Sequence, residues 1–337
     1  MNVALSILAV LASLSVSSLP AQLAVRNPNC KATKNWVREE GSIDTMGSLI
    51  GIVAYGNDAG RVRAAISDAL DEAARLDAML SNYKPSSEWS EMNRAAAQHP
   101  VRVSEELFHL LSTCMEYSRE SEGTFDISVG PLMKVWGFYK QSGHLANRTQ
   151  IRAALESVGS SKVILNPKDL SVRFSRRGVE LDPGGIGKGY AVDRMAEILR
   201  REGVRAALVS AGGSSIYAMR APPGENGWRI DIKDPHNLST ASQSVILRDE
   251  SLSTSGNYEK SFYADGKLWS HIMDPRTGYP SQGMLSVSVI APKTIDSEAW
   301  AKPYYILGRN WTAKHKKKEF QVFMCEDKPG ANCSWVE

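Results

Sequence analysis

A glycine-rich run in the middle of the chain restricts the local fold more than any other segment. It reads Asp182-Pro183-Gly184-Gly185-Ile186-Gly187-Lys188-Gly189-Tyr190 and precedes a helical pattern of apolar residues that extends to Glu202. The run lacks the first glycine and the Ser/Thr of a P-loop, and it matches no register of the Rossmann G-x-G-x-x-G pattern. It therefore predicts a glycine-rich turn that opens a helix, with Lys188 at the helix start. Such a start suits an anion, although a tight turn with a surface lysine has the same pattern.

Apolar periodicity predicts helices and strands that alternate along the chain. Helices are expected at 60–80, from Ser104 onward and from about Gly189 to Glu202, because apolar residues recur there every three or four positions. Ser104 is a good N-cap, since its hydroxyl can accept a backbone N–H of the first turn. Strands are expected at 206–209, 228–232 and 286–290. The chain contains no internal repeat, so the pattern favours one compact α/β or α+β unit.

The N-terminal segment is typical of a cleaved secretory signal. Residues 3–19 form an apolar run that is followed by the small residues Ala21 and Ala24, and cleavage after either of these is consistent with the sequence. Serines interrupt the run, which makes an uncleaved anchor of about 20 apolar residues a poorer interpretation. We therefore expect a signal peptide over 1–24, one mature domain over 25–337 and a periplasmic or otherwise exported location.

Net charge and cysteine spacing narrow the class of protein further. A formal charge of +3 over 337 residues is too small to argue for a nucleic-acid partner. The four cysteines include no CxxC pair, which disfavours a zinc or thioredoxin-like site. Export makes a disulfide between Cys325 and Cys333 reasonable. Cys114 falls on the apolar stripe of a helix, where we expect it to be buried as a small hydrophobic side chain.

A second segment combines a histidine with a carboxylate. In the run Ser270-His271-Ile272-Met273-Asp274-Pro275-Arg276-Thr277-Gly278, His271 precedes Asp274 by three residues, and Gly278 can close the Asp-Pro turn. A histidine beside a carboxylate, together with a backbone that can approach phosphates, predicts a phosphoryl-transfer site. A structural histidine is the alternative interpretation, because that is the usual role of a lone histidine.

Taken in order, eight segments resemble the FAD:protein FMN transferase family, the ApbE-like proteins. They span roughly residues 42–308. The matching segments are Met46-Gly47-Ser48, Leu80-Ser81-Asn82-Tyr83, Ser90-Glu91-Met92-Asn93, Gly123-Thr124-Phe125-Asp126 with Gly130-Pro131-Leu132, Gly185-Ile186-Gly187-Lys188-Gly189-Tyr190-Ala191-Val192-Asp193, Ala211-Gly212-Gly213, Ser253-Thr254-Ser255-Gly256-Asn257-Tyr258, and Ser270 to Gly278. The resemblance implies a single compact α/β (α+β) domain of mixed sheets flanked by helices. It also implies a periplasmic enzyme that splits the FAD pyrophosphate, moves FMN onto a threonine or serine hydroxyl of an acceptor protein and releases AMP.

The resemblance also assigns roles to individual residues. Those expected to line the FAD site are Met46, Tyr83, Thr124, Phe125, Asp126, Asp182 and Lys188. His271 would contact FAD beside the reacting phosphate and assist deprotonation of the acceptor hydroxyl, and Asp274 would be the second catalytic residue. This chemistry is sound, because a hydroxyl is a poor nucleophile until a base takes its proton. The transferred phosphoryl group also needs positive charge around its oxygens.

The family supplies that charge with Mg²⁺, and here the sequence departs from the family. In the alignment, the carbonyl of Gly185 and the side chain of Glu298 fall at two ligand positions, and Lys302 falls where the family has a threonine. An ammonium ~4 Å from a divalent ion would be repelled by roughly 8 kcal/mol at an effective dielectric of about 20. Either Lys302 points inward and replaces the cation, or it points outward because Pro303 disturbs the helical geometry of the residue before it.

Two other functions fit the same pattern. One is a FAD pyrophosphatase, in which water replaces the acceptor hydroxyl, and the other is a non-catalytic FAD-binding protein with an altered metal site. His271, Asp274 and Lys188 argue against the second, because binding alone needs no base. Ser214 is a smaller departure, since the family usually has an acid after the Gly-Gly pair. The expected partners are FAD and an acceptor flavoprotein, with no nucleic acid and no membrane contact except through the acceptor.

Overall fold

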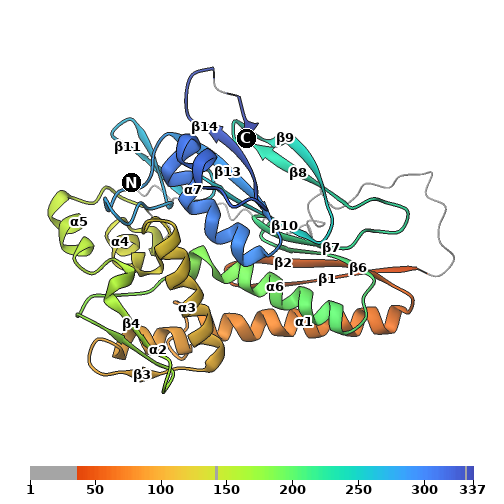
Figure 1. Ribbon diagram of the computed structural model, residues 1–337, viewed down its shortest axis with the longest axis horizontal. Helices are drawn as coiled ribbons and strands as arrows, with labels where there is room; N and C mark the ends of the chain where they lie inside the picture. The colour runs from red at the N-terminus through yellow and green to blue at the C-terminus, as the bar shows by residue number, and fades with distance from the viewer. Residues whose placement is uncertain (1–35, 141–142, 331) are drawn as a thin grey trace, which may run out of the picture.

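An eight-stranded antiparallel sheet forms the centre of the molecule (Figure 1). The computed structural model describes residues 36–140, 143–330 and 332–337, so the expected signal peptide over 1–24 lies outside the described residues. The strands, in their order across the sheet, are β1 (Val37–Thr45), β2 (Ser48–Gly56), β6 (Ala206–Ala211), β7 (Ser215–Met219), β10 (Glu250–Gly256), β13 (Met284–Ala291), β14 (Gln321–Glu326) and β15 (Ser334–Trp335).

Three helices cover one face of this sheet: α1 (Ala59–Leu80), α6 (Gly187–Arg201) and α7 (Thr294–His315) (Figure 1). Side chains alternate between the two faces of a strand, and the inward set packs on these helices. Ile52 and Val209 are paired across β2 and β6 and share one apolar cluster with residues of α1 and α6. Val287 and Val289 of β13 pack in the cluster that contains residues of α7.

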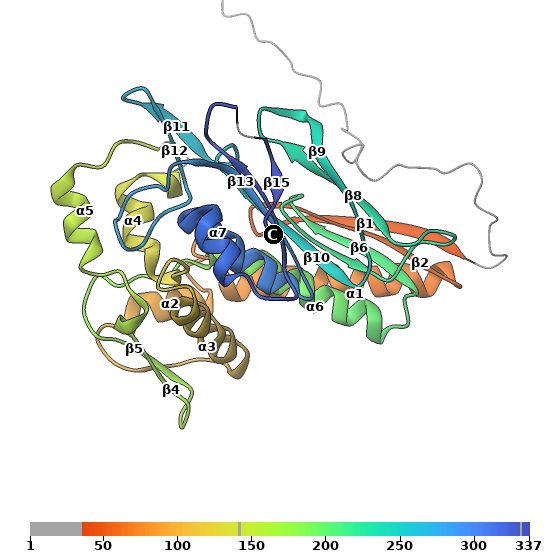
Figure 2. The same ribbon diagram turned by 45° about the horizontal axis from the view of Figure 1, so that its top comes forward.

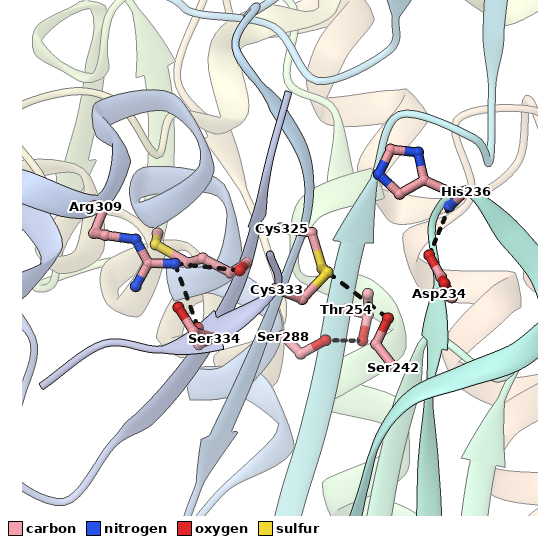
Figure 3. The surroundings of a disulfide bond; sticks show 10 residues. Asp234, His236, Ser242, Thr254, Ser288, Arg309, Cys325, Cys333 and Ser334 are labelled. Atoms are coloured by element: carbon pink, nitrogen blue, oxygen red, sulfur yellow. Dashed lines mark hydrogen bonds between the residues drawn. A yellow bond between two sulfur atoms is a disulfide. The ribbon is translucent and has the colours of Figure 1, made fainter. Parts of the chain in front are cut away.

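The opposite face is covered by a hairpin of β8 (Trp228–Asp234) and β9 (Asn237–Leu247). Figure 2 shows this hairpin on the side of the sheet away from α1 and α6. The expected disulfide is confirmed, because Cys325 of β14 is bonded to Cys333 with an S–S distance of 2.10 Å. It lies against β9, where the Ser242 hydroxyl is 3.7 Å from the Cys333 sulfur (Figure 3).

A second group of elements lies at one end of the sheet, at the left in Figure 1. It contains α2 (Glu88–Ala95), α3 (Glu105–Glu120), α4 (Gly130–Val135), α5 (Arg148–Leu155), the small sheet β3 (Val101–Arg102), β5 (Ser171–Phe174) and β4 (Val163–Asn166), and the hairpin β11 (Ser261–Ala264) and β12 (Lys267–Ser270). Trp89, Phe174 and Tyr304 belong to one buried cluster, which joins this group to α7. Four of the segments that resemble the family also meet in this cluster, through Leu80, Phe125, Ile186 and Ile272.

The sequence-based expectations for the fold are confirmed. The Ser104 hydroxyl accepts the backbone N–H of Leu107 and caps α3, and α6 begins at Gly187, two residues before its expected start. The three predicted strands lie within β6, β8 and β13, and Cys114 is buried with a free thiol. Every strand pair in the described part of the chain is antiparallel, so the domain is of the α+β type. Among the described residues, no helix is both long and apolar enough to span a membrane.

Candidate active site

Asp182 fixes the turn that leads into α6. Its carboxylate accepts the backbone N–H of Gly184 at 2.6 Å and the hydroxyl of Tyr139. Burial raises the pKa of Asp182, while these hydrogen bonds favour its charged form. The residues after it form a single tight turn, Pro183–Gly185, and α6 follows at once. The expected glycine-rich start of a helix is therefore confirmed.

The beginning of α6 lies directly against α7. A Cβ on Gly189 would stand 2.5 Å from the carbonyl oxygen of Thr294, so only glycine allows this approach. Glu298, which is 3% exposed, accepts the backbone N–H of Gly189 with its Oε2. That carboxylate thus satisfies an N–H group that the first turn of a helix leaves unpaired.

Lys302 points into the site. Its Nζ donates to the carbonyl of Gly185 at 3.2 Å and to the carbonyl of Glu298 at 2.8 Å. The alternative in which Pro303 turns this lysine outward is wrong, because α7 continues through the proline and its non-helical residue is Gly308, with φ 74° and ψ −179°. Burial lowers the pKa of Lys302, and the charge of Glu298 opposes that shift.

A divalent cation does not fit beside this ammonium. The two groups expected to bind the cation are the backbone carbonyl of Gly185 and the side-chain carboxylate of Glu298. The first accepts a hydrogen bond from Lys302, and one oxygen of the second accepts the N–H of Gly189. The other carboxylate oxygen lies 4.0 Å from the Lys302 Nζ, as an ion pair. In the described part of the chain, no cluster of three or more His, Cys, Asp or Glu side chains could hold a metal ion.

Lys188 stands in the first turn of α6 and reaches the turn between β6 and β7. Its Nζ donates to the hydroxyl of Ser214 at 2.5 Å. The turn itself needs glycine, since Gly212 and Gly213 have φ of 61° and 70°. Ser214 therefore supplies a neutral acceptor where the family usually has an acid, and it leaves the charge of Lys188 uncompensated by that side chain.

His271 follows β12 and is a neutral base. Its Nδ1 lies 3.3 Å from the carbonyl oxygen of Lys260. A carbonyl can only accept, so a hydrogen bond there puts the proton on Nδ1 and leaves Nε2 basic. The pKa of His271 is lowered to about 4, mainly by burial and also by the charges of Lys260, Lys302 and Lys188, while the hydrogen bond to the Lys260 carbonyl opposes the shift.

Asp274 does not pair with His271 as the sequence predicted. Its carboxylate accepts the backbone N–H of Arg276 at 2.9 Å and two guanidinium N–H groups of the same residue at 3.0 Å each. The turn closes as expected at Gly278, whose N–H donates to the Asp274 carbonyl at 2.9 Å and whose φ is 77°. The physical reason for the difference is local, because the nearest donors to this carboxylate lie two residues away within its own turn.

Three further residues of the expected FAD site have hydrogen bonds or packing contacts within the protein. The Thr124 hydroxyl donates to the carbonyl of Ser121 at 2.6 Å, and Asp126 accepts hydrogen bonds from Ser128 and Ser160. Burial raises the pKa of Asp126. Phe125 is buried beside the glycine-rich turn, where a Cβ on Gly185 would lie 3.5 Å from its ring. Asp126 also lines a cavity of about 380 Å³, together with Arg276.

Met46 and Tyr83 approach the glycine-rich turn from two other elements. Met46 lies in the turn between β1 and β2, and a Cβ on Gly187 would be 3.4 Å from its Cε. Tyr83 is 69% exposed and packs edge-to-face on Tyr139, with the ring centroids 6.2 Å apart. Tyr139 in turn donates to Asp182. These contacts bring residues from distant parts of the sequence to one place.

Two residues of the site were missed from the sequence. Tyr139 follows the aromatic run Trp136-Gly137-Phe138, and no spacing pattern links it to Asp182. Lys260 precedes β11, and its carbonyl accepts the backbone N–H of His271 at 2.9 Å. The only sequence feature that could have indicated Lys260 is its position close to the Ser253 to Tyr258 motif.

The chemistry that these groups can perform defines a class of protein. Backbone N–H groups at a helix start and several ammonium groups bind a phosphate ester, and a neutral imidazole beside them can accept a proton. These properties are those of an enzyme that acts on a phosphate or pyrophosphate bond.

Comparison with known proteins identifies the family. The model of the ApbE family matches residues 46–324. A FAD:protein FMN transferase of Klebsiella pneumoniae (strain 342) is 35% identical over 267 residues, which are 78% of this chain and 80% of the relative. One of Salmonella typhimurium (strain LT2) is 31% identical over 288 residues, covering 83% and 82%. The crystal structure of the ApbE protein of Thermotoga maritima superimposes with a TM-score of 0.82 at 27% identity, over 89% of this chain and 97% of that one. The chain belongs to the ApbE family.

Proposed function

We propose that this chain is a FAD:protein FMN transferase, which moves FMN from FAD onto a threonine or serine hydroxyl of an acceptor protein and releases AMP. The two bacterial relatives described above carry that name. The observation that carries the proposal is the neutral imidazole of His271 within the field of Lys188, in the first turn of α6, and of Lys302, which bonds the glycine-rich turn. FAD is the substrate from which the FMN group is taken.

The transfer is a displacement at phosphorus. The acceptor oxygen forms a bond to the phosphorus of the FMN half, and the bond between that phosphorus and the oxygen that bridges to the AMP half breaks. AMP leaves with the electron pair of the broken bond, and the hydroxyl proton passes to Nε2 of His271. This step needs a base that is unprotonated at neutral pH, which the low pKa of His271 supplies.

The remaining side chains would bind and orient FAD. Lys188 and the first N–H groups of α6 face the pyrophosphate, because an anion is stabilised at a helix N-terminus. Tyr83 is exposed and has an aromatic neighbour, so it can pack against a flavin or adenine ring. Asp182 and Asp126 hold the two backbone segments of the site in place through their hydrogen bonds to Gly184 and Ser160. Asp274 acts through the turn that it stabilises.

The proposed location is the periplasm or another exported compartment. The apolar N-terminal segment supports this proposal, and so does the disulfide between Cys325 and Cys333, because disulfides persist in oxidising compartments. The partner is an exported or membrane-bound flavoprotein whose threonine or serine receives the FMN group. Mg²⁺, which the family resemblance implies as cofactor, conflicts with the position of Lys302.

The proposal is tested with the variant His271→Asn, which removes the base and keeps a neutral side chain. We expect the rate of FMN transfer to an acceptor peptide to fall by at least about 100-fold, which is the lower range for loss of a general base. FAD affinity, measured by flavin fluorescence, should change little. The matched control is His99→Asn, which changes an exposed histidine in the turn that follows α2. Unchanged transfer by His271→Asn would refute the assigned role.

A FAD pyrophosphatase is the second candidate. The site that binds the acceptor hydroxyl could also admit water. Water is smaller and, like the hydroxyl, loses an O–H proton when it attacks phosphorus. The two functions differ in their products, because hydrolysis releases free FMN and transfer leaves FMN on the acceptor. No contact of the described residues favours water over a protein hydroxyl, so transfer, which the named relatives indicate, is preferred.

A further inference from the structure

We infer that the ammonium of Lys302 replaces a divalent cation in this protein, so that FAD binds and reacts without a metal ion. The inference rests on the proposed function, since it concerns the pyrophosphate of the same substrate. Its basis is the position of one side chain relative to two carbonyls and one carboxylate.

Lys302 hydrogen-bonds one of the oxygen atoms that a cation would need, the carbonyl oxygen of Gly185. Its Nζ hydrogen-bonds the carbonyls of Gly185 at 3.2 Å and Glu298 at 2.8 Å. Magnesium requires oxygen ligands about 2.0–2.1 Å away in a near-ideal octahedron. A divalent ion bound to the Gly185 carbonyl would therefore share that oxygen with a positively charged nitrogen.

Glu298 is committed to protein contacts instead of a metal. It is almost completely buried, with its side chain 4% exposed, and Oε2 accepts the N–H of Gly189 at the start of α6. Oε1 lies 4.0 Å from the Lys302 Nζ. The carboxylate thus compensates the lysine charge and caps the helix, which are two roles that a metal ligand could not keep unchanged.

The position of Lys302 is fixed because α7 is tied to its neighbours. Asp193 of α6 accepts the backbone N–H groups of Thr294 and Ile295 at 2.7 and 2.8 Å, at the beginning of α7. The hydroxyl of Ser297 hydrogen-bonds that of Ser251 in β10 at 2.9 Å. α7 therefore has a defined rotation about its axis, and Lys302 faces the glycine-rich turn.

Lys302 can still bind an anion. An ammonium has three N–H donors, and the hydrogen bonds to Gly185 and Glu298 use two of them. Its side chain is 22% exposed, whereas that of Glu298 is 4% exposed, so the lysine is the accessible member of the pair. The charges of Lys302, Lys188 and Lys260 all act on His271, so positive charge surrounds the imidazole that the proposed function puts beside the reacting phosphate. A phosphoryl group needs this charge from some source, and here the lysines supply it.

The first test measures FAD affinity by calorimetry in EDTA and in Mg²⁺. For the wild-type protein we expect the two dissociation constants to agree within about twofold. Lys302→Met should bind FAD about 10- to 100-fold more weakly in both buffers, as expected for a lost charged hydrogen bond. Lys168→Met, which removes an exposed lysine in the turn between β4 and β5, is the matched control and should bind FAD as the wild type does. Wild-type affinity that falls tenfold or more in EDTA would overturn the inference.

The second test restores the side chain of the family with Lys302→Thr. We expect this variant to bind FAD weakly in EDTA and to regain at least tenfold in affinity when Mg²⁺ is added. Wild-type affinity of this variant in EDTA would contradict the role of Lys302. Both tests read binding, so they remain decisive if the protein transfers no FMN. Absence of transfer in every buffer would refute the proposed function, whereas transfer that strictly requires Mg²⁺ would refute only the inference about Lys302.

Discussion

Lowering the pH from 6.5 to about 5 should leave His271 neutral in the folded protein. At pH 5.5 an imidazole with the usual pKa of about 6.5 is about nine-tenths protonated, whereas one with a pKa of about 4 is only about 3% protonated. Burial is the main cause of the low pKa, and the charge of Lys260 is the largest contribution from a lysine. The neutral form is the active one, so kcat/KM should be retained to about pH 5 and lost as the pH falls through about 4.

The assay is an NMR titration of the histidine Cε1–H signals of the free protein. The chain has six histidines, and the spectrum of His271→Asn assigns the signal that disappears. We expect this signal to titrate near pH 4, and Lys260→Met should move its midpoint upward because one positive charge is removed. Between pH 6.5 and 4 the unfolded state binds a proton that the folded state does not, so His271 also lowers the free energy of unfolding as the pH falls through this window. A midpoint near 6.5 would refute the reasoning.

Three further perturbations test the packing and the site. Gly189→Ala should lower the free energy of unfolding by about 1–3 kcal/mol in urea melts, because overpacking outweighs the helix preference of alanine. Gly187→Ala in the same helix is the control, since its added Cβ would lie 3.4 Å from the nearest atom. Its free energy of unfolding should stay within about 1 kcal/mol of the wild-type value. Cys333→Ser removes the disulfide that closes a loop of 8 residues. By the loop-entropy estimate it should lower the free energy of unfolding by about 2.5 kcal/mol in the same melts. An unchanged free energy of unfolding would contradict this expectation. Tyr83→Ala should weaken FAD binding about tenfold by fluorescence titration with an unchanged melt, and an altered melt would point to a structural role.

Much of the local structure was predictable because its causes are local. The periodicity of 60–80 and the hydroxyl of Ser104 specify α1 and the start of α3 within a few residues. The glycine-rich turn was also predictable, since Gly189 is needed for the close contact with α7 and the run of glycines indicates a close approach of backbones. The resemblance to the family then indicated which of these segments contribute residues to one site.

Contacts between distant segments were not predictable in the same way. The hydrogen bond of Tyr139 to Asp182 depends on how the aromatic run folds over the turn, and neither residue type requires the other. The inward direction of Lys302 follows from the rotation of α7, which is set by tertiary contacts. By contrast, the pairing of Asp274 with Arg276 could have been recognised, because a carboxylate in a turn commonly accepts the N–H two residues later.

The most direct test of the central claim is the ratio of AMP to flavin-labelled acceptor. The purified mature protein is incubated with FAD, with and without an acceptor peptide that carries a family-type threonine motif. AMP is measured by chromatography, and covalent FMN on the peptide is measured by mass spectrometry. A transferase should release AMP only with the acceptor present, in a ratio of about one AMP per labelled peptide, because each transfer breaks one pyrophosphate bond. Release of AMP together with free FMN in the absence of acceptor would contradict the claim and identify a hydrolase.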